Sequence, residues 1–203
     1  RSEIVQMFEP HHFSSTQTLL HSPIGIITIA TVPIVIVGGL FNEFIEQNLR
    51  SPSIIAVASI FFGILLYFAD LKQAKKDEVL QLTLLIGLLI GLSQILALIP
   101  GTSRSGITIT MGLFLGLSRV EALRFSFMLA IPVIAAATIL QSIELFVIQL
   151  TDINYLHLFL GVFISFIIAF LTIRWFIEFV NRIGMLPFAI YRIFLGVIIF
   201  LTL

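Results

Sequence analysis

Residues 79–118 read VLQLTLLIGLLIGLSQILALIPGTSRSGITITMGLFLGLS and decide the fold. This apolar run contains a single charge, Arg104, within the hydroxyl-rich turn PGTSRSG at 100–106. A membrane helix needs about 20 apolar residues, so the run is too long for one span. Pro100 and Gly101 divide it near its middle, because proline ends a helix. We therefore expect a re-entrant helical hairpin over 79–117, with both arms starting from the same side of a membrane.

The composition of the whole chain indicates an all-α, polytopic integral membrane protein. Its 203 residues are 59% hydrophobic and only 11% charged, with a mean hydropathy of +1.13. A soluble domain of this size could not bury so much apolar surface. We expect one membrane domain, 1–203, with about five transmembrane helices besides the hairpin. These helices are predicted at about 23–41, 53–69, 125–148, 156–173 and 187–203.

The charge and the residue types exclude several classes of function. A formal net charge of zero argues against a nucleic-acid binder. The sequence has no cysteine, which removes disulfides, thiolate metal sites and cysteine-based phosphatase chemistry. Residues 1–22 are polar and lack the pattern of a signal peptide, so we expect a cytoplasmic loop that began upstream of Arg1.

Lysine and arginine predict the orientation, because cytoplasmic loops are enriched in them. The loops at 42–52 and 149–155 hold only Arg50 among acidic residues. The basic residues of the opposite face are Arg1, Lys72, Lys75, Lys76, Arg119, Arg124, Arg174 and Arg182. That face is predicted to be cytoplasmic, and the hairpin starts and ends there. A first arm of about 21 residues would reach about 30 Å, so the turn is expected to open toward the extracytoplasmic side.

Two further patterns concern helix packing. Glycines spaced four apart at 87–91 and 112–116 predict close helix contacts, although glycine is also common in membrane helices. Pro33 and Pro132 have similar neighbours, which suggests an internal repeat. In such a repeat, the hairpin before Pro132 would have a counterpart before Pro33, largely upstream of Arg1.

The turn itself has the features of an anion site. The second arm is predicted to begin at about Gly106, with its free N–H groups and positive dipole end directed at the turn. Arg104 adds a fixed cation, and a charge at membrane depth normally faces a bundle interior or a wet cavity. Gly101 and Gly106 let the backbone approach a ligand. The hydroxyls around the arginine belong to Thr102, Ser103, Ser105 and Thr108.

Alternatives to this interpretation remain. Gly101 to Thr108 is one residue from a P-loop, but Ile107 stands where lysine is required. No acidic residue lies between Glu78 and Glu121, so the hydroxyls lack a nearby base, which a serine nucleophile or an attacking water needs. The turn would otherwise be a polar hinge whose arginine is satisfied by carbonyls.

Other polar residues of the apolar segments have less specific interpretations. Gln94 either hydrogen-bonds across the site or joins two helices. Arg192 is expected to extend to the cytoplasmic edge rather than to reach the substrate. Glu144 and His157 fall near the outer ends of their helices, where we expect solvated side chains.

The sequence resembles the undecaprenyl-diphosphate phosphatase family, the bacitracin-resistance phosphatases. The matching blocks are QxxALIPGTSRSGxT from Gln94 to Thr108, RFSFxLAIP from Arg124 to Pro132, and LPFAIYR from Leu186 to Arg192. The resemblance covers roughly residues 24–203. It implies hydrolysis of a polyprenyl diphosphate to the monophosphate, which recycles the lipid carrier of cell-wall synthesis.

The resemblance also implies roles for individual residues. Arg104 would bind the diphosphate, and Ser103, Ser105 and Thr108 would contact or position phosphate oxygens. A divalent cation, Mg²⁺ or Ca²⁺, is implied, with its ligands on a second, acidic hairpin. The E-x-x-x-E motif of that hairpin is not found, so we expect the metal ligands outside this chain. The serine, histidine and acidic residues at 9–16 resemble it only superficially.

These observations lead to three hypotheses of function. The first is an undecaprenyl-diphosphatase in the bacterial plasma membrane, with a polyprenyl diphosphate lipid as its substrate. The second is a transporter or flippase for a lipid phosphate, since repeats and broken helices around a central phosphate site also occur in transporters. The third is a truncated, inactive form that binds lipid phosphate. The sequence leaves the oligomeric state open, a homo-oligomer included.

Overall fold

The computed structural model describes residues 22–73, 80–147 and 155–203, which form helices and contain no strand. This confirms the all-α fold class. In chain order the elements are α3 (Pro23–Asn48), α4 (Pro52–Gln73), α5 (Leu84–Ser93), the 3₁₀ helix η1 (Gln94–Leu98), α6 (Arg104–Leu115), α7 (Arg119–Val147), α8 (Tyr155–Ile183) and α9 (Leu186–Leu201).

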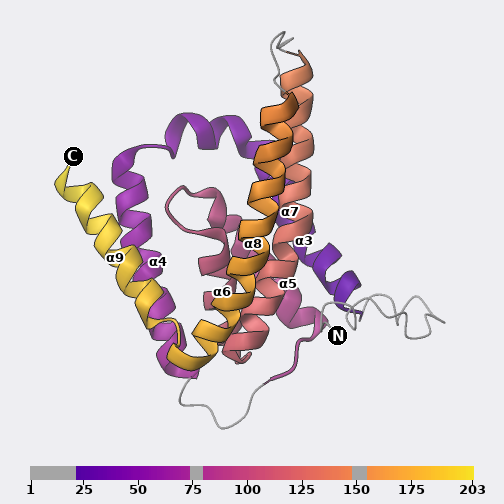
Figure 1. The fold of residues 1–203 in the computed structure, drawn as a ribbon. Coiled ribbons are helices and arrows are strands. Elements are labelled where there is room, and N and C mark those ends of the chain that lie inside the picture. The colour runs from indigo at the N-terminus through magenta and orange to yellow at the C-terminus, as the bar shows by residue number, and fades with distance from the viewer. Residues whose placement is uncertain (1–21, 74–79, 148–154) are drawn as a thin grey trace.

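The hairpin of α5, η1 and α6 lies inside the molecule, with the longer helices around it (Figure 1). α4 and α9 stand side by side on one flank, while α7 and α8 stand side by side on the other. α3 packs against α5 and α7. It contains Pro33, and its last part runs across one end of the molecule toward α4. The hairpin turn is therefore surrounded by helices that come from both halves of the sequence.

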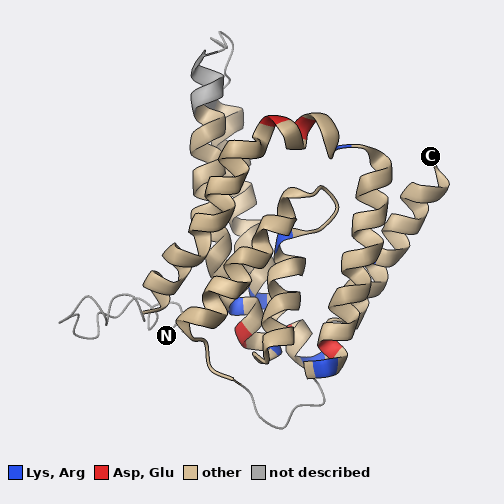
Figure 2. Ribbon diagram, turned by 180° about the vertical axis from the view of Figure 1, so that it is seen from behind, with Lys and Arg blue, Asp and Glu red and all other residues tan. Residues whose placement is uncertain are grey.

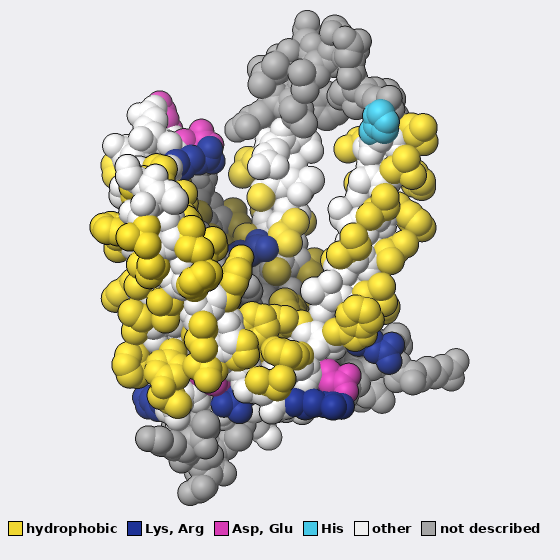
Figure 3. Space-filling model, turned by 60° about the vertical axis from the view of Figure 1, so that its left-hand side comes forward, with side chains coloured by type: hydrophobic (Ala, Val, Ile, Leu, Met, Phe, Trp, Pro, Cys, Tyr) yellow, Lys and Arg dark blue, Asp and Glu magenta, His cyan; other side chains and the backbone are white. Residues whose placement is uncertain are grey.

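Four of the described helices are long and apolar enough to cross a membrane: α3, α4, α7 and α8. α9 is equally apolar but has 16 residues, about 24 Å of helix. Figure 3 shows hydrophobic side chains spread over the outer surface, as expected of helices that face lipid. The chain is therefore a polytopic membrane protein.

Most charged residues lie at the two ends of the helices (Figure 2). One end is mainly basic in Figure 2, and it contains an ion pair between a buried aspartate and a partly exposed arginine. Arg119 Nε lies 2.6 Å from Asp70 Oδ1, and the other oxygen of Asp70 accepts the Met185 N–H at 3.1 Å. Asp70 thus joins the end of α4 to the start of α7 and to the α8–α9 connection. The opposite end carries Glu46, paired with Arg50.

The predicted hairpin is confirmed, with both ends on the same side: the Leu80 N–H donates to Gly116 O at 3.0 Å. Its first arm is shorter than predicted. Residues 80–83 are not helical, and 84–98 comprise α5 and η1, about 25 Å of helix. The turn accordingly lies between the two ends of the long helices, below the upper ends of α4 and α9 in Figure 1.

Several predicted helix limits are wrong by about a turn or more. The segment 42–52, predicted as a loop, is mostly helix, because α3 continues to Asn48. α7 begins at Arg119 rather than 125, and α8 continues to Ile183 rather than 173. The predicted limits followed hydropathy, which falls at charged residues. The helices are longer because their backbone hydrogen bonds continue through those residues. The expected cytoplasmic loop at 1–22 lies almost entirely outside the described residues.

Candidate functional site

The turn between η1 and α6 is a tight backbone structure pressed against α4. Thr102 N donates to Ile99 O at 3.2 Å, and Gly101 has a φ of 91°. A Cβ on Gly101 would lie 2.4 Å from Ile55 O, so both the conformation and the space require glycine. Ser59 of α4 donates its hydroxyl to Gly101 O at 3.2 Å.

α6 begins two residues earlier than predicted, at Arg104, with Ser103 as its N-cap. The Gly106 N–H donates to Ser103 Oγ at 3.2 Å. Ser103 has a φ of 66°, and it is the one non-glycine residue of the described ranges with a positive φ. The first N–H groups of a helix have no partner within it, and the dipole makes this end positive. The turn therefore directs a helix N-terminus toward the space beside Arg104, and anion binding there stays a prediction.

Arg104 is the first residue of α6 and is half-buried. Its guanidinium has no hydrogen bond or ion pair to any described residue. The side chains of Ser103 and Ser105 on either side of it are exposed. Figure 2 shows a basic position in the middle of the molecule, away from the charges at both ends. Figure 3 shows a basic side chain on the wall of the hollow between the two columns of helices. A cation and two hydroxyls are thus open to a ligand.

Thr108 is placed differently from Ser103 and Ser105. Its side chain is buried, and its hydroxyl lies 2.7 Å from Ser126 Oγ of α7. The same hydroxyl donates to Arg104 O at 3.0 Å. Thr108 therefore fixes the first turn of α6 against α7. Of the two roles expected for it, positioning fits this geometry better than direct contact.

Thr102 and Gln94 are both almost completely buried, with exposed fractions of 0% and 1%. Thr102 Oγ1 and Gln94 Nε2 have no hydrogen-bond partner among the described residues. Buried polar atoms without partners are uncommon in folded proteins and often mark an ordered water or a ligand. These two predicted site residues thus lie behind the turn rather than on its open face.

Arg192 contacts the turn, where the sequence interpretation did not place it. The prediction that it extends to the cytoplasmic edge is wrong, since the residue is 9% exposed and points into the molecule. Its Nη2 donates to Gly101 O at 2.8 Å and to Thr102 O at 2.5 Å. The signal that could have found it is the one used for Arg104, a lone charge within apolar sequence.

The described residues offer neither a base nor a metal site at the turn. They contain no group of three or more histidine, aspartate or glutamate side chains that could hold a metal ion. Five described carboxylates are engaged elsewhere, namely Glu43 with Gln47, Glu46 with Arg50, Asp70 with Arg119, Glu121 with Ser118, and Glu178 with Arg182. The groups present, cations and hydroxyls, do not fit a divalent cation.

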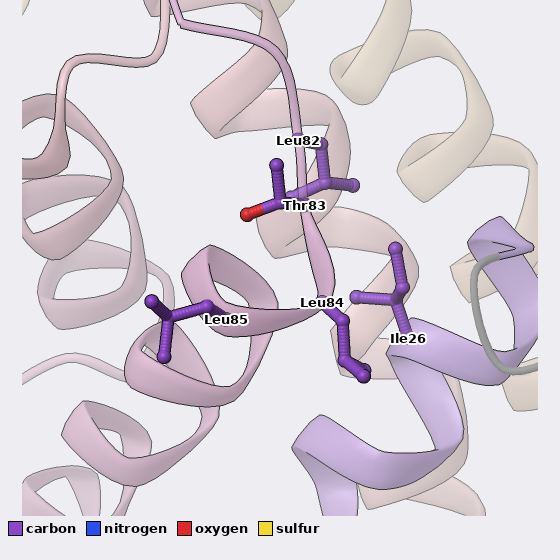
Figure 4. A pocket seen from close by; sticks show the side chains of 5 residues that line it. All are labelled: Ile26, Leu82, Thr83, Leu84 and Leu85. Atoms are coloured by element: carbon purple, nitrogen blue, oxygen red, sulfur yellow. The ribbon is translucent and has the colours of Figure 1, made fainter.

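One pocket of the described residues lies away from the turn. It has a volume of about 520 Å³, lies where α5 begins beside α3, and is lined by Ile26, Leu82, Thr83, Leu84 and Leu85 (Figure 4). The single polar lining residue, Thr83, already accepts the Ile86 N–H at 3.3 Å. The pocket holds no charge and does not contribute to the anion site.

Comparison with known proteins gives a consistent family assignment. Residues 2–198 match the family model of the bacitracin resistance protein BacA. The undecaprenyl-diphosphatase of Saccharophagus degradans is 48% identical over 170 residues, which are 84% of this chain and 63% of that relative. That of Teredinibacter turnerae is 46% identical, over 85% of this chain and 65% of the relative. That of Alteromonas mediterranea is 43% identical, over 98% of this chain and 76% of the relative.

The chain thus covers less than two thirds of the length of the Saccharophagus and Teredinibacter relatives. The match nevertheless includes the hairpin, its turn and the helices around it, because the family model extends over almost all of the residues described above. Because the family model matches residues 2–198, the chain belongs to the BacA family.

Proposed function

We propose that this chain binds the diphosphate group of a polyprenyl lipid at the α6 N-terminus and takes part in its hydrolysis to the monophosphate. The observation that carries the proposal is the Arg104 guanidinium at that N-terminus, which has no ion-pair partner among the described residues. Support comes from the relatives above, which are named undecaprenyl-diphosphatase. Recycling of the undecaprenyl carrier of the bacterial cell wall is the corresponding role.

The chain's own groups suit binding and charge stabilisation. The Arg104 guanidinium can bind two phosphate oxygens with parallel N–H donors, and the N–H groups of α6 can bind a third. Charge that develops on phosphate oxygens during transfer is stabilised by the same fixed donors. Ser103 and Ser105 present hydroxyls beside it, either of which would orient a phosphate oxygen or accept the phosphoryl group. Water is the other acceptor.

A base and a divalent cation complete the proposal, and both would come from residues outside the described ranges. A divalent cation would neutralise diphosphate charge and polarise the phosphoryl oxygens. The described residues do not fit the oxygen ligand set of such a cation. The site is proposed to open to the extracytoplasmic side of the bacterial plasma membrane.

The test is phosphate release from undecaprenyl diphosphate in detergent, with Mg²⁺ or Ca²⁺ and then with EDTA. This chain is compared with a form extended upstream of Arg1 by the sequence of the Saccharophagus relative. We expect release by the extended form and loss of release with EDTA. If neither form releases phosphate, the proposed hydrolysis is contradicted. Activity of the present chain alone would place the base within its 203 residues.

In the active form, Arg104→Lys is expected to lower kcat/KM by about 10²-fold, because lysine cannot form the two-pronged contact. The matched control is Arg182→Lys, an exposed pair with Glu178 far from the turn, which should leave kcat/KM unchanged. Near-normal hydrolysis by the Arg104 variant would refute its role.

A transporter of lipid phosphate is the second candidate, favoured by the lack of a base at the turn among the described residues. The same detergent assay separates the two, because transport requires a bilayer with two sides. Phosphate release in detergent supports the enzyme. Movement of a labelled lipid phosphate across proteoliposomes without phosphate release would support the transporter.

A further inference from the structure

Arg192 of α9 is buried inside the molecule. None of the described residues offers it a carboxylate. The five carboxylates with known contacts bind other residues. Its Nη2 is bound to two carbonyl oxygens of the turn, Gly101 O and Thr102 O. A buried guanidinium is costly without a counter-charge, so the fold keeps it at this position for a reason other than stability alone.

The second terminal nitrogen of Arg192 lies under the first turn of α6. Nη1 is buried and has no hydrogen-bond partner among the described residues. A methyl group added to Gly106 would lie 2.5 Å from Nη1 and 3.1 Å from Ser103 Oγ. The N-terminus of α6 therefore has two cations close to it, Arg104 at its open face and Arg192 behind it.

The contacts of Arg192 also determine which groups of the turn face outward. Carbonyl oxygens repel an anion, whereas helix N–H groups attract it. Gly101 O is held by Arg192 and by Ser59 of α4, and Thr102 O is held by Arg192. With both oxygens held behind the turn, Ser103 adopts its strained φ of 66° and α6 starts with its N–H groups exposed to the site.

We propose that Arg192 is a positioning residue of the phosphate site. It holds the Gly101 and Thr102 carbonyls away from the anion and places its uncompensated charge behind the first turn of α6. The inference deepens the proposed function and rests on it for its kinetic test. Arg192 acts through the backbone of the turn, whereas Arg104 contacts the phosphate.

The kinetic test uses the active form and three substitutions. Arg192→Lys keeps the charge but not the contact to both carbonyls, so kcat should fall by about 10²-fold while KM stays within about threefold. Arg192→Ala also removes the charge, so KM should rise as well. Gly106→Ala displaces Nη1 without changing any charge and should behave as Arg192→Lys does. Arg182→Lys is the matched control.

A double-substitution cycle separates this role from a structural one. In the Arg192→Ala background the added methyl at Gly106 no longer meets Nη1 and keeps only its 3.1 Å contacts with Ser103, so the double variant should have kinetic constants close to those of Arg192→Ala alone. Melting temperatures in detergent report folding independently. A folded Arg192→Lys protein with wild-type kcat and KM would overturn the proposal. It would also be overturned if the fold-changes of Arg192→Ala and Gly106→Ala simply multiplied in the double variant.

A binding test remains valid if hydrolysis is not found. Inorganic pyrophosphate should raise the melting temperature of the wild-type protein, and Arg192→Ala should abolish this shift. If the wild type binds pyrophosphate but releases no phosphate from the lipid, the proposed hydrolysis fails while the role of Arg192 stands. A wild type that pyrophosphate does not stabilise, or a shift that persists in Arg192→Ala, would overturn the inference about Arg192.

Discussion

Ser103 combines a favourable contact with an unfavourable backbone conformation. Its Oγ accepts the Gly106 N–H, which caps α6, but its φ of 66° is costly for a residue with a Cβ. A serine N-cap contributes about 1 kcal/mol, and a strained conformation costs about 1–3 kcal/mol. The strain is located at the proposed phosphate site. There the backbone conformation is imposed by the contacts of the turn with α4 and α9, not by a preference of Ser103 itself.

We predict that Ser103→Gly and Ser103→Ala differ in stability. Both lose the cap, but glycine also relieves the positive φ. Alanine should lower the free energy of unfolding by about 1 kcal/mol. Glycine should leave it near that of the wild type or above it. Chemical denaturation in detergent measures both variants. Equal stability of the two would mean that Ser103 is not strained.

The two arginines show how far the sequence could predict individual residues. Arg104 was predicted as a site residue because it is the lone charge of an apolar run beside helix-breaking residues. Arg192 met the first of these conditions but not the second, since it lies inside a regular helix, and it was interpreted as extending to the edge. Its target is 91 residues away in the sequence. A lone charge in apolar sequence indicates that the side chain needs a polar partner. The identity of that partner becomes clear only from the packing of α9 on α4.

At the scale of the elements, glycines let the arms of the hairpin pack closely against the neighbouring helices. A Cβ on Gly91 of α5 would lie 2.2 Å from Ala30 O of α3, and one on Gly87 would lie 2.1 Å from Ile26 Cγ2. The predicted close contact of the first arm is therefore confirmed. In the second arm Gly112 approaches Ala122 of α7, whereas Gly116 has a φ of 102° and ends α6. The spacing at 112–116 thus combines one contact with one helix end.

We predict that Gly91→Ala lowers the free energy of unfolding by about 1–3 kcal/mol, because the methyl group must push α5 away from α3. The control is Gly39→Ala, also in a helix, where nothing lies within 4 Å of the added Cβ. That change should be neutral or stabilising by up to about 1 kcal/mol. Thermal unfolding of both purified variants gives the comparison. Equal effects at the two positions would contradict the contact.

Elements were predictable in number and type, but less so in their limits. Apolar length and Pro100 indicated the hairpin and the helices around it. The length of the first arm was overestimated, because residues 80–83, in which Leu80 and Leu82 keep the run apolar, have non-helical backbone. Apolarity alone does not separate these two cases. The internal repeat suggested by Pro33 and Pro132 stays a prediction, although both prolines lie inside long helices, α3 and α7.

At the scale of the molecule, Asp70 connects the helices at the basic end, because it contacts both Arg119 of α7 and the α8–α9 connection. Asp70→Asn would leave Arg119 without its charge partner, and because Arg119 is partly exposed we expect a loss of about 1–3 kcal/mol. We predict a lower melting temperature with unchanged kcat and KM, because the pair lies at the opposite end of α4 from the turn contacts. Unfolding in detergent and hydrolysis by the folded fraction measure the two effects. A change in KM would show that this end influences the site.

The orientation across the membrane is testable because the sequence has no cysteine. Thr102 is fully buried, so the reporter is Ser103→Cys, whose side chain is exposed. We predict that a membrane-impermeant maleimide labels it from the extracytoplasmic side of intact cells. Lys72→Cys, at the basic end, should react only after the membrane is opened. Labelling of Ser103→Cys only from the cytoplasmic side would reverse the proposed orientation.

The contact between Arg192 and the turn has a consequence for biosynthesis. The hairpin is synthesised and inserted well before α9, and until α9 arrives the Gly101 and Thr102 carbonyls lack the guanidinium that holds them. Contacts so distant in sequence form late, after the loops between them have closed. A nascent chain that ends after α8 would therefore contain the complete anion-binding motif without its working conformation. On the proposed role of Arg192, the site would be complete only after α9 has docked.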